Sequence, residues 1–336
     1  MTGSSVERIT WRGAPAWRKG QERIHHVSGR YFSLVVLSIK GREHLFIDQP
    51  EVGILGFLMT VHEGEPHWLV QAKAEPGNVG LTQWAPTVQA TKSNYERVHG
   101  GRETPHLEAF RHVDARDVRG SEQGDRFLNK FNRNALRPVP ASRMQDASDT
   151  TLTWTSSTDF KGALLRDYEV NTDARSVVVC ANWDAHVPHG RSPFEGAPWR
   201  SSHARAFGRS WFDVSQQRVD AALEVLRSNS KPSLPPRRIV PIDDWREHAW
   251  TEEGVRDAKG ALVVGVFDCA IPQREVERWQ QPLVEQEDAQ QVVLLARIDG
   301  DQAWFCVTGY AEPGHEGRGV FGPTLQTGNG QGKRSS

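Results

Sequence analysis

The stretch "AEPGNVGLTQWAPTVQA", Ala74 to Ala90, decides the fold because a similar stretch occurs a second time in the chain. Ala311 to Thr327 reads "AEPGHEGRGVFGPTLQT", and at an offset of 237 residues eight of sixteen aligned positions are identical without a gap. A second match, at an offset of 232, pairs "REHLFIDQP" (42–50) with "REVERWQQP" (274–282). Repeats of this length indicate two copies of one structural unit in the chain.

Each copy also has the pattern of a β-hairpin. In the first copy, apolar runs at 52–61 and 67–74 flank the polar turn "HEGEP". In the second copy, runs at 290–298 and 303–311 flank "DGDQ". Short β-rich runs around a polar, Gly-containing turn predict two antiparallel strands. The Pro-Gly loop and "PT[VL]Q" follow each hairpin.

Composition limits the kind of protein. The 336 residues include 41 basic and 42 acidic side chains, a formal net charge of -1, which argues against a general nucleic-acid binder. The three cysteines form no CxxC pair, which favours reduced thiols. The longest apolar run, 52–59, is too short to span a bilayer. We therefore predict a soluble, cytoplasmic protein with no nucleic-acid or membrane partner.

The predicted fold class is α+β, with strands dominating both copies. Helical spacing of apolar residues predicts helices at 124–135 and 160–168, and an amphipathic helix at 213–228 capped by Asp213 or Ser215. The run 170–183 has the appearance of a turn leading into a buried strand. The predicted boundaries are a first module at 1–183, a linker at 184–238, a second and shortened module at 239–327, and a disordered tail at 328–336.

Common catalytic and metal-binding motifs are absent from the sequence. It contains no GxGxxG after a strand, P-loop, HExxH or GxSxG. His25 with His26, and His186 with His189, lack acidic or Cys partners at ligand spacing, so solvated loop histidines are the better interpretation. No metal site is predicted.

Polar residues gather instead in the first copy. Strand alternation places Gln71, Lys73 and Glu75 on one face, which is either an ordinary solvated strand face or the wall of a site. Turn geometry explains the repeated Pro and Gly, but it does not demand the repeated Glu, Thr and Gln. Amides suit sugar hydroxyls, Arg and Lys suit a diphosphate, and aromatic rings suit a base. The candidate binding residues are Gln49, Gln71, Trp84, Thr87, Gln89, Lys92, Ser93, Asn94, Tyr95, Arg97, Arg126, Asn132 and Arg133.

Several long motifs carry a family resemblance. "QPEVGILGFL", "VQAKAEPGNV", "PTVQATKSNYERVHGG", "SEQGDRFLNKFNRN" and "VNTDARSVV" resemble the NDP-hexose 2,3-dehydratases, which act in deoxysugar biosynthesis for antibiotics. The likeness covers about 24–180 and resumes over "RRIVPIDDW", "REVERWQQPL" and "FGPTLQ". It implies two tandem Nudix-like modules, although the Nudix metal box is absent. It also implies a homodimer, with a downstream 3-ketoreductase as a further expected partner.

The resemblance implies a dTDP-4-keto-6-deoxy-glucose substrate and a 3,4-diketo-2,6-dideoxy product. The C4 ketone acidifies the C3 hydrogen, so a base, an enolate stabiliser and an acid suffice without a cofactor. Lys73 is the candidate enolate stabiliser or base, and Glu75 the alternative base or the acid that protonates the leaving hydroxyl. Two other interpretations stay open: a truncated relative that binds a nucleotide-sugar or scaffolds a partner without turnover, and a nucleotide-sugar epimerase or isomerase.

Overall fold

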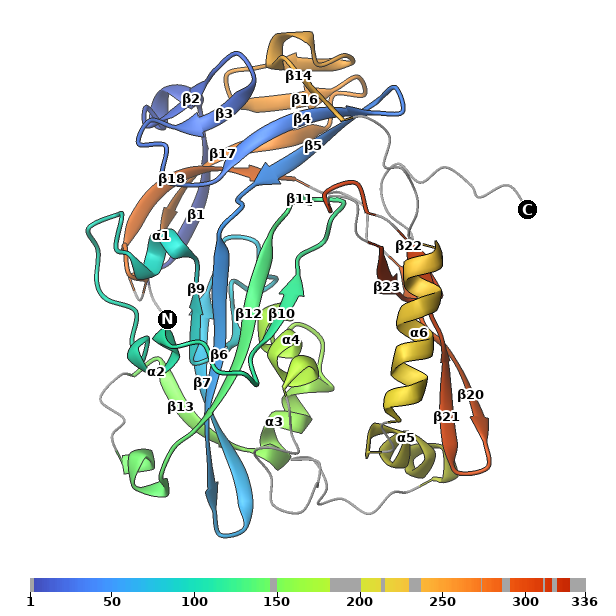
Figure 1. The fold of residues 1–336 in the computed structure, drawn as a ribbon. Coiled ribbons are helices and arrows are strands. Elements are labelled where there is room, and N and C mark those ends of the chain that lie inside the picture. The colour runs from blue at the N-terminus through green and yellow to red at the C-terminus, as the bar shows by residue number, and fades with distance from the viewer. Residues whose placement is uncertain are drawn as a thin grey trace.

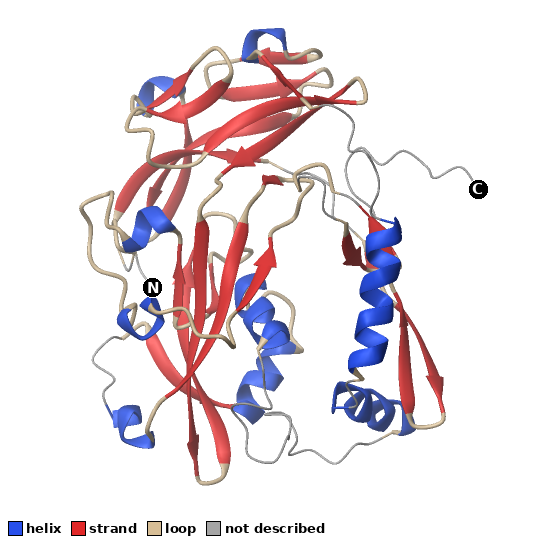
Figure 2. Ribbon diagram, in the orientation of Figure 1, coloured by secondary structure: helices blue, strands red, loops and turns tan. Residues whose placement is uncertain are grey.

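Strands predominate over helices in the computed structural model of the chain (Figure 2), which confirms the α+β class. The structure describes residues 3–145, 150–181, 201–212, 215–229, 237–272, 274–285, 291–310, 312–315 and 319–326. The Nudix-like assignment and the domain boundaries stay predictions. Asp213, His186, His189 and the predicted tail lie outside the described residues.

The predicted first hairpin is present and lies at the centre of a seven-stranded sheet (Figure 1). Its turn residues Glu63 and Gly64 have φ values of 50° and 79°, as a tight two-residue hairpin turn requires. The strand order is β10 (Val118–Ser121), β12 (Phe131–Pro138), β6 (Val52–His62), β7 (Glu65–Ala74) and β13 (Leu152–Ser156), with β8 (Thr82–Ala85) beside β7 and β9 (Val88–Ala90) beside β6.

Two further sheets pack face to face above it (Figure 1). One contains β2 (Trp17–Lys19), β3 (Arg23–His26), β4 (Ser33–Ile39), β5 (Arg42–Asp48), β11 (Phe127–Leu128) and β14 (Arg238–Val240). The other contains β1 (Ser5–Ile9), β15 (His248–Trp250), β16 (Gly254–Asp257), β17 (Leu262–Ala270) and β18 (Arg278–Val284). Trp17, Leu34, Val255 and Val264 belong to the shared core, so both halves of the chain contribute to one hydrophobic cluster.

The two halves of the chain repeat one order of elements and exchange their first strands. A short 3-10 turn, η1 (Trp11–Gly13) or η5 (Ile242–Asp244), follows β1 or β14, and four strands come next in each half. Strand β1 pairs with β17 of the second half, whereas β14 pairs with β4 of the first half. Each half therefore completes the sheet of the other, and the halves cannot separate without breaking both sheets.

The repeated threonine ties two strands together in each half. The Thr87 hydroxyl accepts a hydrogen bond from the Leu58 N–H at 3.0 Å and donates to the Leu69 carbonyl. In the second half, Thr324 accepts from the Leu295 N–H at 2.9 Å and donates to the Cys306 carbonyl. The threonine and both of its partners keep the offset of 237 residues. The threonine in "PT[VL]Q" thus joins the two strands of the hairpin.

Two predicted elements of the first half are wrong. Residues 124–135, expected as a helix, form β11 and β12, which are separated by Asn129 with a φ of 51°. Strand β12 runs parallel to β6, and its alternating side chains face opposite sides of the sheet. Residues 170–183, expected as a strand, contain α4 (Thr172–Cys180). The Asn171 side chain caps this helix by accepting from the Ala174 N–H at 2.8 Å.

Two other helices are confirmed. The expected helix at 160–168 is α3 (Ser157–Leu164), which begins earlier because Ser156 caps it. It lies with α4 against one face of the seven-stranded sheet, where Phe57, Trp68 and Phe160 form the core. The amphipathic helix is α6 (Gln216–Asn229), whose Leu223 and Leu226 are half-buried while Val219 is 40% exposed.

The second hairpin, also as predicted, is β20 (Leu295–Asp299) and β21 (Gln302–Cys306). Helix α5 (Ser202–Phe212) packs on it, with Phe207 against Phe305 and the Ser210 hydroxyl accepting from the Ala303 N–H. The remaining elements are α1 (Lys92–Tyr95), α2 (Glu108–Arg111), η2 (Ala141–Gln145), β19 (Val292–Val293), β22 (Thr308–Tyr310), β23 (Val320–Gly322) and β24 (Leu325–Gln326). Among the described residues, no helix has the length and apolar character needed to cross a membrane.

Candidate functional site

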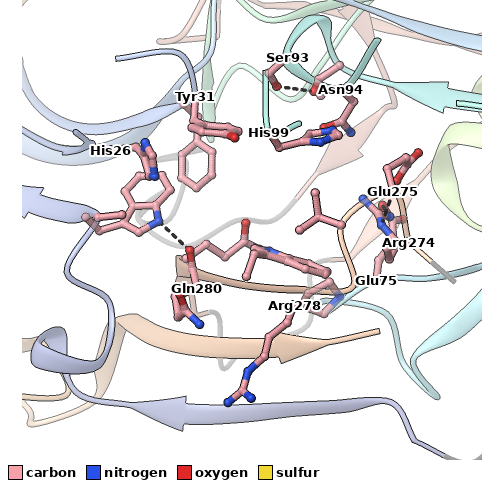
Figure 3. A pocket seen from close by; sticks show the side chains of 18 of the residues that line it. His26, Tyr31, Glu75, Ser93, Asn94, His99, Arg274, Glu275, Arg278 and Gln280 are labelled. Carbon is pink, nitrogen blue, oxygen red and sulfur yellow. Dashed lines mark hydrogen bonds and ion pairs between the residues drawn. The ribbon is translucent and has the colours of Figure 1, made fainter. Parts of the chain in front are cut away.

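A cavity of about 520 Å³ lies where the packed sheets meet the loops of the seven-stranded sheet (Figure 3). One of its walls is aromatic: Trp17 lies 4.8 Å from Phe32 between ring centroids, and His26 lies 4.7 Å from Tyr31. The Trp17 indole N–H donates to the Gln280 carbonyl at 2.7 Å, which fixes this ring. Such a wall offers flat apolar surfaces to a base or a sugar ring.

The facing wall is polar and charged, and it comes from both halves of the chain. Glu75 at the end of β7 and His99 in the loop after α1 belong to the first half (Figure 3). Arg274 and Glu275, in the loop between β17 and β18, belong to the second half. Arg274 Nη1 lies 3.5 Å from Glu75 Oε1, and Arg274 Nε lies 3.5 Å from Glu275 Oε2. A cation between two carboxylates therefore forms part of this wall.

A relay of amides orients Glu75. Gln89 Nε2 lies 3.1 Å from each carboxylate oxygen of Glu75 and donates to them. Gln89 Oε1 in turn accepts from Asn171 Nδ2 at 2.8 Å, and the side-chain oxygen Oδ1 of Asn171 caps α4. The repeated glutamate and glutamine of the first half are thus one hydrogen-bonded unit, anchored to a helix.

The Arg274 loop is clamped by the first half. Arg102 N–H donates to the Glu275 carbonyl at 2.8 Å, and Arg102 Nη2 donates to the carbonyls of Pro272 and Arg274 at 2.7 and 2.8 Å. Gly101 permits this approach, because a Cβ there would overlap the Glu275 carbonyl oxygen and lie 2.7 Å from His99 Nδ1. These hydrogen bonds hold the charged side chains of Arg274 and Glu275 near Glu75.

Lys73 lies behind this wall and lines a neighbouring cavity of about 210 Å³ with Gln71, Arg274 and Glu275. Its side chain is buried, and its ammonium group donates to the Gln89 carbonyl at 3.0 Å. Burial lowers the pKa of Lys73, and Arg274 lowers it further, while Glu275 and Glu75 oppose the shift. Burial raises the pKa of Glu275, but the charges of Lys73 and Arg274 outweigh it and hold the value below its usual range.

A second group of charges lies near the start of α4. Burial raises the pKa of Asp173 to about 7, with help from Glu122 and Glu75 and against Lys73 and Lys130. Burial also raises the pKa of Glu122 and lowers that of Lys130. Asp173 can therefore hold or release a proton near neutral pH, a property typical of functional sites.

Replacing Asp173 by asparagine should stabilise the protein in a pH-dependent way. The folded pKa of about 7 exceeds the ordinary 3.8, so the folded chain binds the extra proton and loses stability as the pH rises through this window. We expect D173N to equal the wild type below about pH 4 and to exceed it by about 4 kcal/mol above pH 7.5.

Urea unfolding at several pH values measures this difference. Asp159→Asn, in the first turn of α3, is the control, because Asp159 is exposed; it should change stability by less than about 0.5 kcal/mol. A gain for D173N that does not vary with pH would contradict the assignment.

Another cavity, of about 490 Å³, is lined by Tyr95 and Arg133 together with Arg111 and Arg119. Arg133 Nη1 lies 3.4 Å from Asp117 Oδ2, and the guanidinium also donates to the Phe110 carbonyl. The buried Asp117 also pairs with Arg137 at 2.6 Å. This cavity is rich in arginine, but its one carboxylate is already neutralised.

The structure thus separates the residues singled out in the sequence. Gln49, Glu75, Ser93 and Asn94 line the 520 Å³ cavity; Gln71 and Lys73 line the adjoining one; Tyr95 and Arg133 line the arginine-rich one. Gln89 and Asn132 donate hydrogen bonds to Glu75 and Glu122, respectively.

Five other candidate residues have different surroundings. Lys92 pairs with Glu96 at 3.6 Å, and Arg97 Nε donates to the Gly101 carbonyl. Trp84 packs on the α3–α4 core, and Thr87 joins two strands. Arg126 lies in the turn before β11, where its N–H donates to the Gln123 carbonyl.

Arg274, Glu275, His99 and Asp173 are not among the candidate residues predicted from the sequence. Arg274 and Glu275 were visible only as an anchor of the repeat, and Asp173 lies in a motif expected to be a turn and a strand. In the described residues, no group of three or more His, Cys, Asp or Glu side chains is arranged to hold a metal ion.

Comparisons with known proteins identify the family. Residues 1–181 and 216–334 match the family model described as NDP-hexose 2,3-dehydratase. The chain is 29% identical to a dTDP-4-dehydro-6-deoxy-alpha-D-glucopyranose 2,3-dehydratase of Saccharopolyspora spinosa, over 96% of this chain and 68% of that protein. Proteins of the same name from Amycolatopsis orientalis and Streptomyces violaceoruber are 30% and 31% identical, over 88% and 90% of this chain and 61% and 67% of their own length. The chain thus spans about two thirds of the length of these relatives.

Proposed function

Because the chain belongs to the NDP-hexose 2,3-dehydratase family, we propose that it removes water from C2 and C3 of dTDP-4-keto-6-deoxy-glucose. The observation that carries this proposal is the pairing of Glu75 with Arg274 in the wall of a cavity opposite aromatic rings. A carboxylate beside a cation suits the removal of a proton next to a ketone.

The size and lining of the cavity support a nucleotide-sugar. Its volume of about 520 Å³ lies in the range of roughly 300–1,000 Å³ common for small-molecule sites. Trp17, Tyr31 and Phe32 offer apolar faces to the base or the sugar ring, while Ser93 and Asn94 on the α1 side offer hydroxyl and amide groups. The amphiphilic ligand would thus meet a wall of matching character at each end.

In the proposed reaction Glu75 removes the C3 proton, because of the two candidate catalytic residues it is the one that lines this cavity. The electron pair moves toward the C4 oxygen and forms an enolate, which the positive charge of Arg274 favours. The enolate then expels the C2 hydroxyl, which takes up the proton that Glu75 removed from C3 and leaves as water; the resulting enol tautomerises to the 3,4-diketone. The C4 ketone of the substrate makes this possible, so the proposed reaction needs no cofactor.

Lys73 acts in this proposal through its neighbours. Its Nζ holds the backbone of Gln89, whose side chain holds Glu75, and its charge faces Glu75 and Glu275. A lysine whose pKa is lowered by burial is also able to return a proton to the site. We therefore propose that Lys73 positions Glu75 and can return a proton to the Glu75–Arg274–Glu275 group.

Incubating the purified chain with dTDP-4-keto-6-deoxy-glucose in D₂O, with sugar protons followed by NMR, tests the proposal. The expected result is the loss of the C2 hydroxyl with a new 2-deoxy signal or its breakdown products. Deuterium entering C3 without elimination would instead favour an epimerase or isomerase. If the sugar is unchanged while dTDP still raises the melting temperature, the chain binds nucleotide-sugars without turnover.

The proposal extends to partners and setting. A 3,4-diketone is reactive, so a reductase acting at C3 is the expected next enzyme in antibiotic deoxysugar biosynthesis, and we place both in the cytoplasm. A homodimer is proposed as the working assembly. Exposed apolar side chains on and beside the second hairpin support it, because large exposed apolar patches mark interaction surfaces; these include Val292, Leu294, Leu295 and Trp304.

A further inference from the structure

His99 has one ring nitrogen occupied and one free, in a way that settles its tautomer. The Gly101 N–H donates to His99 Nδ1 at 2.8 Å. A nitrogen that accepts a hydrogen bond carries no proton, so the neutral ring carries its proton on Nε2. Burial lowers the pKa of His99, and Arg274 and Arg97 lower it further against the effect of Glu275, so the neutral ring prevails at neutral pH.

The protonated Nε2 is a buried donor, and the part of the chain that the structure describes provides no acceptor for it. Arg274 Nη1 is also buried and makes no hydrogen bond with the described residues, although it is ion-paired with Glu75 Oε1 at 3.5 Å. Buried donors nearly always make hydrogen bonds in folded proteins, so two that make none, in the wall of one cavity, point to a ligand acceptor.

We propose that His99 Nε2–H and Arg274 Nη1 together form an oxyanion site for the C4 oxygen of the keto-sugar. One donor comes from each half of the chain, and Figure 3 shows them on the same side of the cavity, beside Glu275 and Glu75. This proposal rests on the proposed function. It assigns the base and the oxyanion donors to one wall, so that proton removal by Glu75 and charge development on the C4 oxygen occur side by side.

A neutral imidazole suits this role better than a charged one. A neutral donor can hold the ketone in the ground state and strengthen its hydrogen bond as the oxygen becomes negative, without attracting the Glu75 carboxylate away from the sugar. The Gly101 N–H enforces this state, because a doubly protonated ring could not accept its hydrogen bond. Gly101 thus allows the close approach of the Arg274 loop and also fixes the tautomer of His99.

Two substitutions separate the two nitrogens. His99→Asn keeps an acceptor near the Nδ1 position for the Gly101 N–H and removes the Nε2 donor, whereas His99→Gln extends an amide toward the Nε2 position. We expect H99N to lower kcat for C3 exchange and dehydration by about 100-fold, as loss of one oxyanion donor does, with KM changed by less than about threefold. H99Q should recover to within about tenfold of the wild type. An H99N enzyme within threefold of the wild type in kcat would overturn the proposal.

The imidazole ¹⁵N spectrum of the wild-type chain provides a test that needs no variant. The free protein should show the Nε2–H tautomer at pH 7.5, and dTDP-4-keto-6-deoxy-glucose, but not dTDP alone, should shift the Nε2–H signal. An Nδ1–H tautomer, or a bound keto-sugar that leaves the signal unmoved, would overturn the oxyanion site. A wild-type chain that binds the keto-sugar without exchange or dehydration contradicts the proposed function alone, and the ring spectrum still decides on the donor.

Discussion

Replacing Glu75 by glutamine should lower C3 deuterium exchange and dehydration by at least about 1,000-fold, because the amide cannot take up the C3 proton. Glutamine has almost the same shape and keeps an oxygen for the hydrogen bond from Gln89, so the fold and the binding of dTDP should survive. Rates measured by NMR in D₂O, together with the melting temperature with and without dTDP, separate lost chemistry from lost binding.

The chain contains a matched control for this variant. Glu312 occupies the same place in the repeat, but its carboxylate accepts from the Gly124 N–H at 2.7 Å and faces His315 at 3.3 Å, away from the cavity. Glu312→Gln keeps an acceptor for Gly124 and should retain activity within about threefold. Equal losses in the two variants would mean that the repeated glutamates stabilise the fold and that Glu75 is not the base.

Replacing Gly101 by alanine should lower kcat/KM by about 100-fold or more. The new Cβ would overlap the backbone of Glu275, so either the loop after α1 or the Arg274 loop must move. Displacement of a catalytic group by about 1 Å is enough for a loss of this size. The hydrogen bonds of Arg102 to the Arg274 loop should weaken as well, and the melting temperature should fall.

Gly77→Ala is the control for this effect, because a Cβ there meets no atom within 4 Å although Pro76 next to it lines the same cavity. It should behave as the wild type does in both assays. If Gly101→Ala keeps its activity within threefold, the Arg274 loop does not depend on the clamp. This result would contradict the proposal that the site is built from both halves of the chain.

Much of the scaffold was predictable from local patterns. The hairpins follow from the alternation of apolar and polar residues around Gly-containing turns, and the repeated motif predicts two similar halves. The strand predicted in residues 170–183 is wrong because three valines in succession favour a strand by propensity. The Asn171 cap and the helical spacing of Ala174, Val177 and Val178 stabilise a helix there instead. The helix predicted at residues 124–135 is wrong for the opposite reason: pairing with β6 overrides the helical spacing of their apolar residues.

Only some of the first-half members of the site were predictable, since His99 and Asp173 carry no signal in the sequence that singles them out. Glu75 and Gln89 stood out because no turn demands them, and they are hydrogen-bonded to each other. Thr87 stood out for the same reason, yet its hydroxyl joins two strands, a role that no single-strand pattern reveals. Arg274 approaches Glu75 from about two hundred positions away through strand exchange and a loop clamp, and such long-range proximity leaves no local signal.

We propose that the keto-sugar binds in the cavity that both halves build around Glu75 and Arg274. The structure of the Glu75→Gln variant with dTDP-4-keto-6-deoxy-glucose bound would decide this. We expect the hexose C3 beside residue 75, with the C4 oxygen within hydrogen-bond distance of His99 Nε2 and Arg274 Nη1. A sugar bound instead in the cavity of Tyr95, Arg119 and Arg133, with the cavity at Glu75 empty, would contradict it.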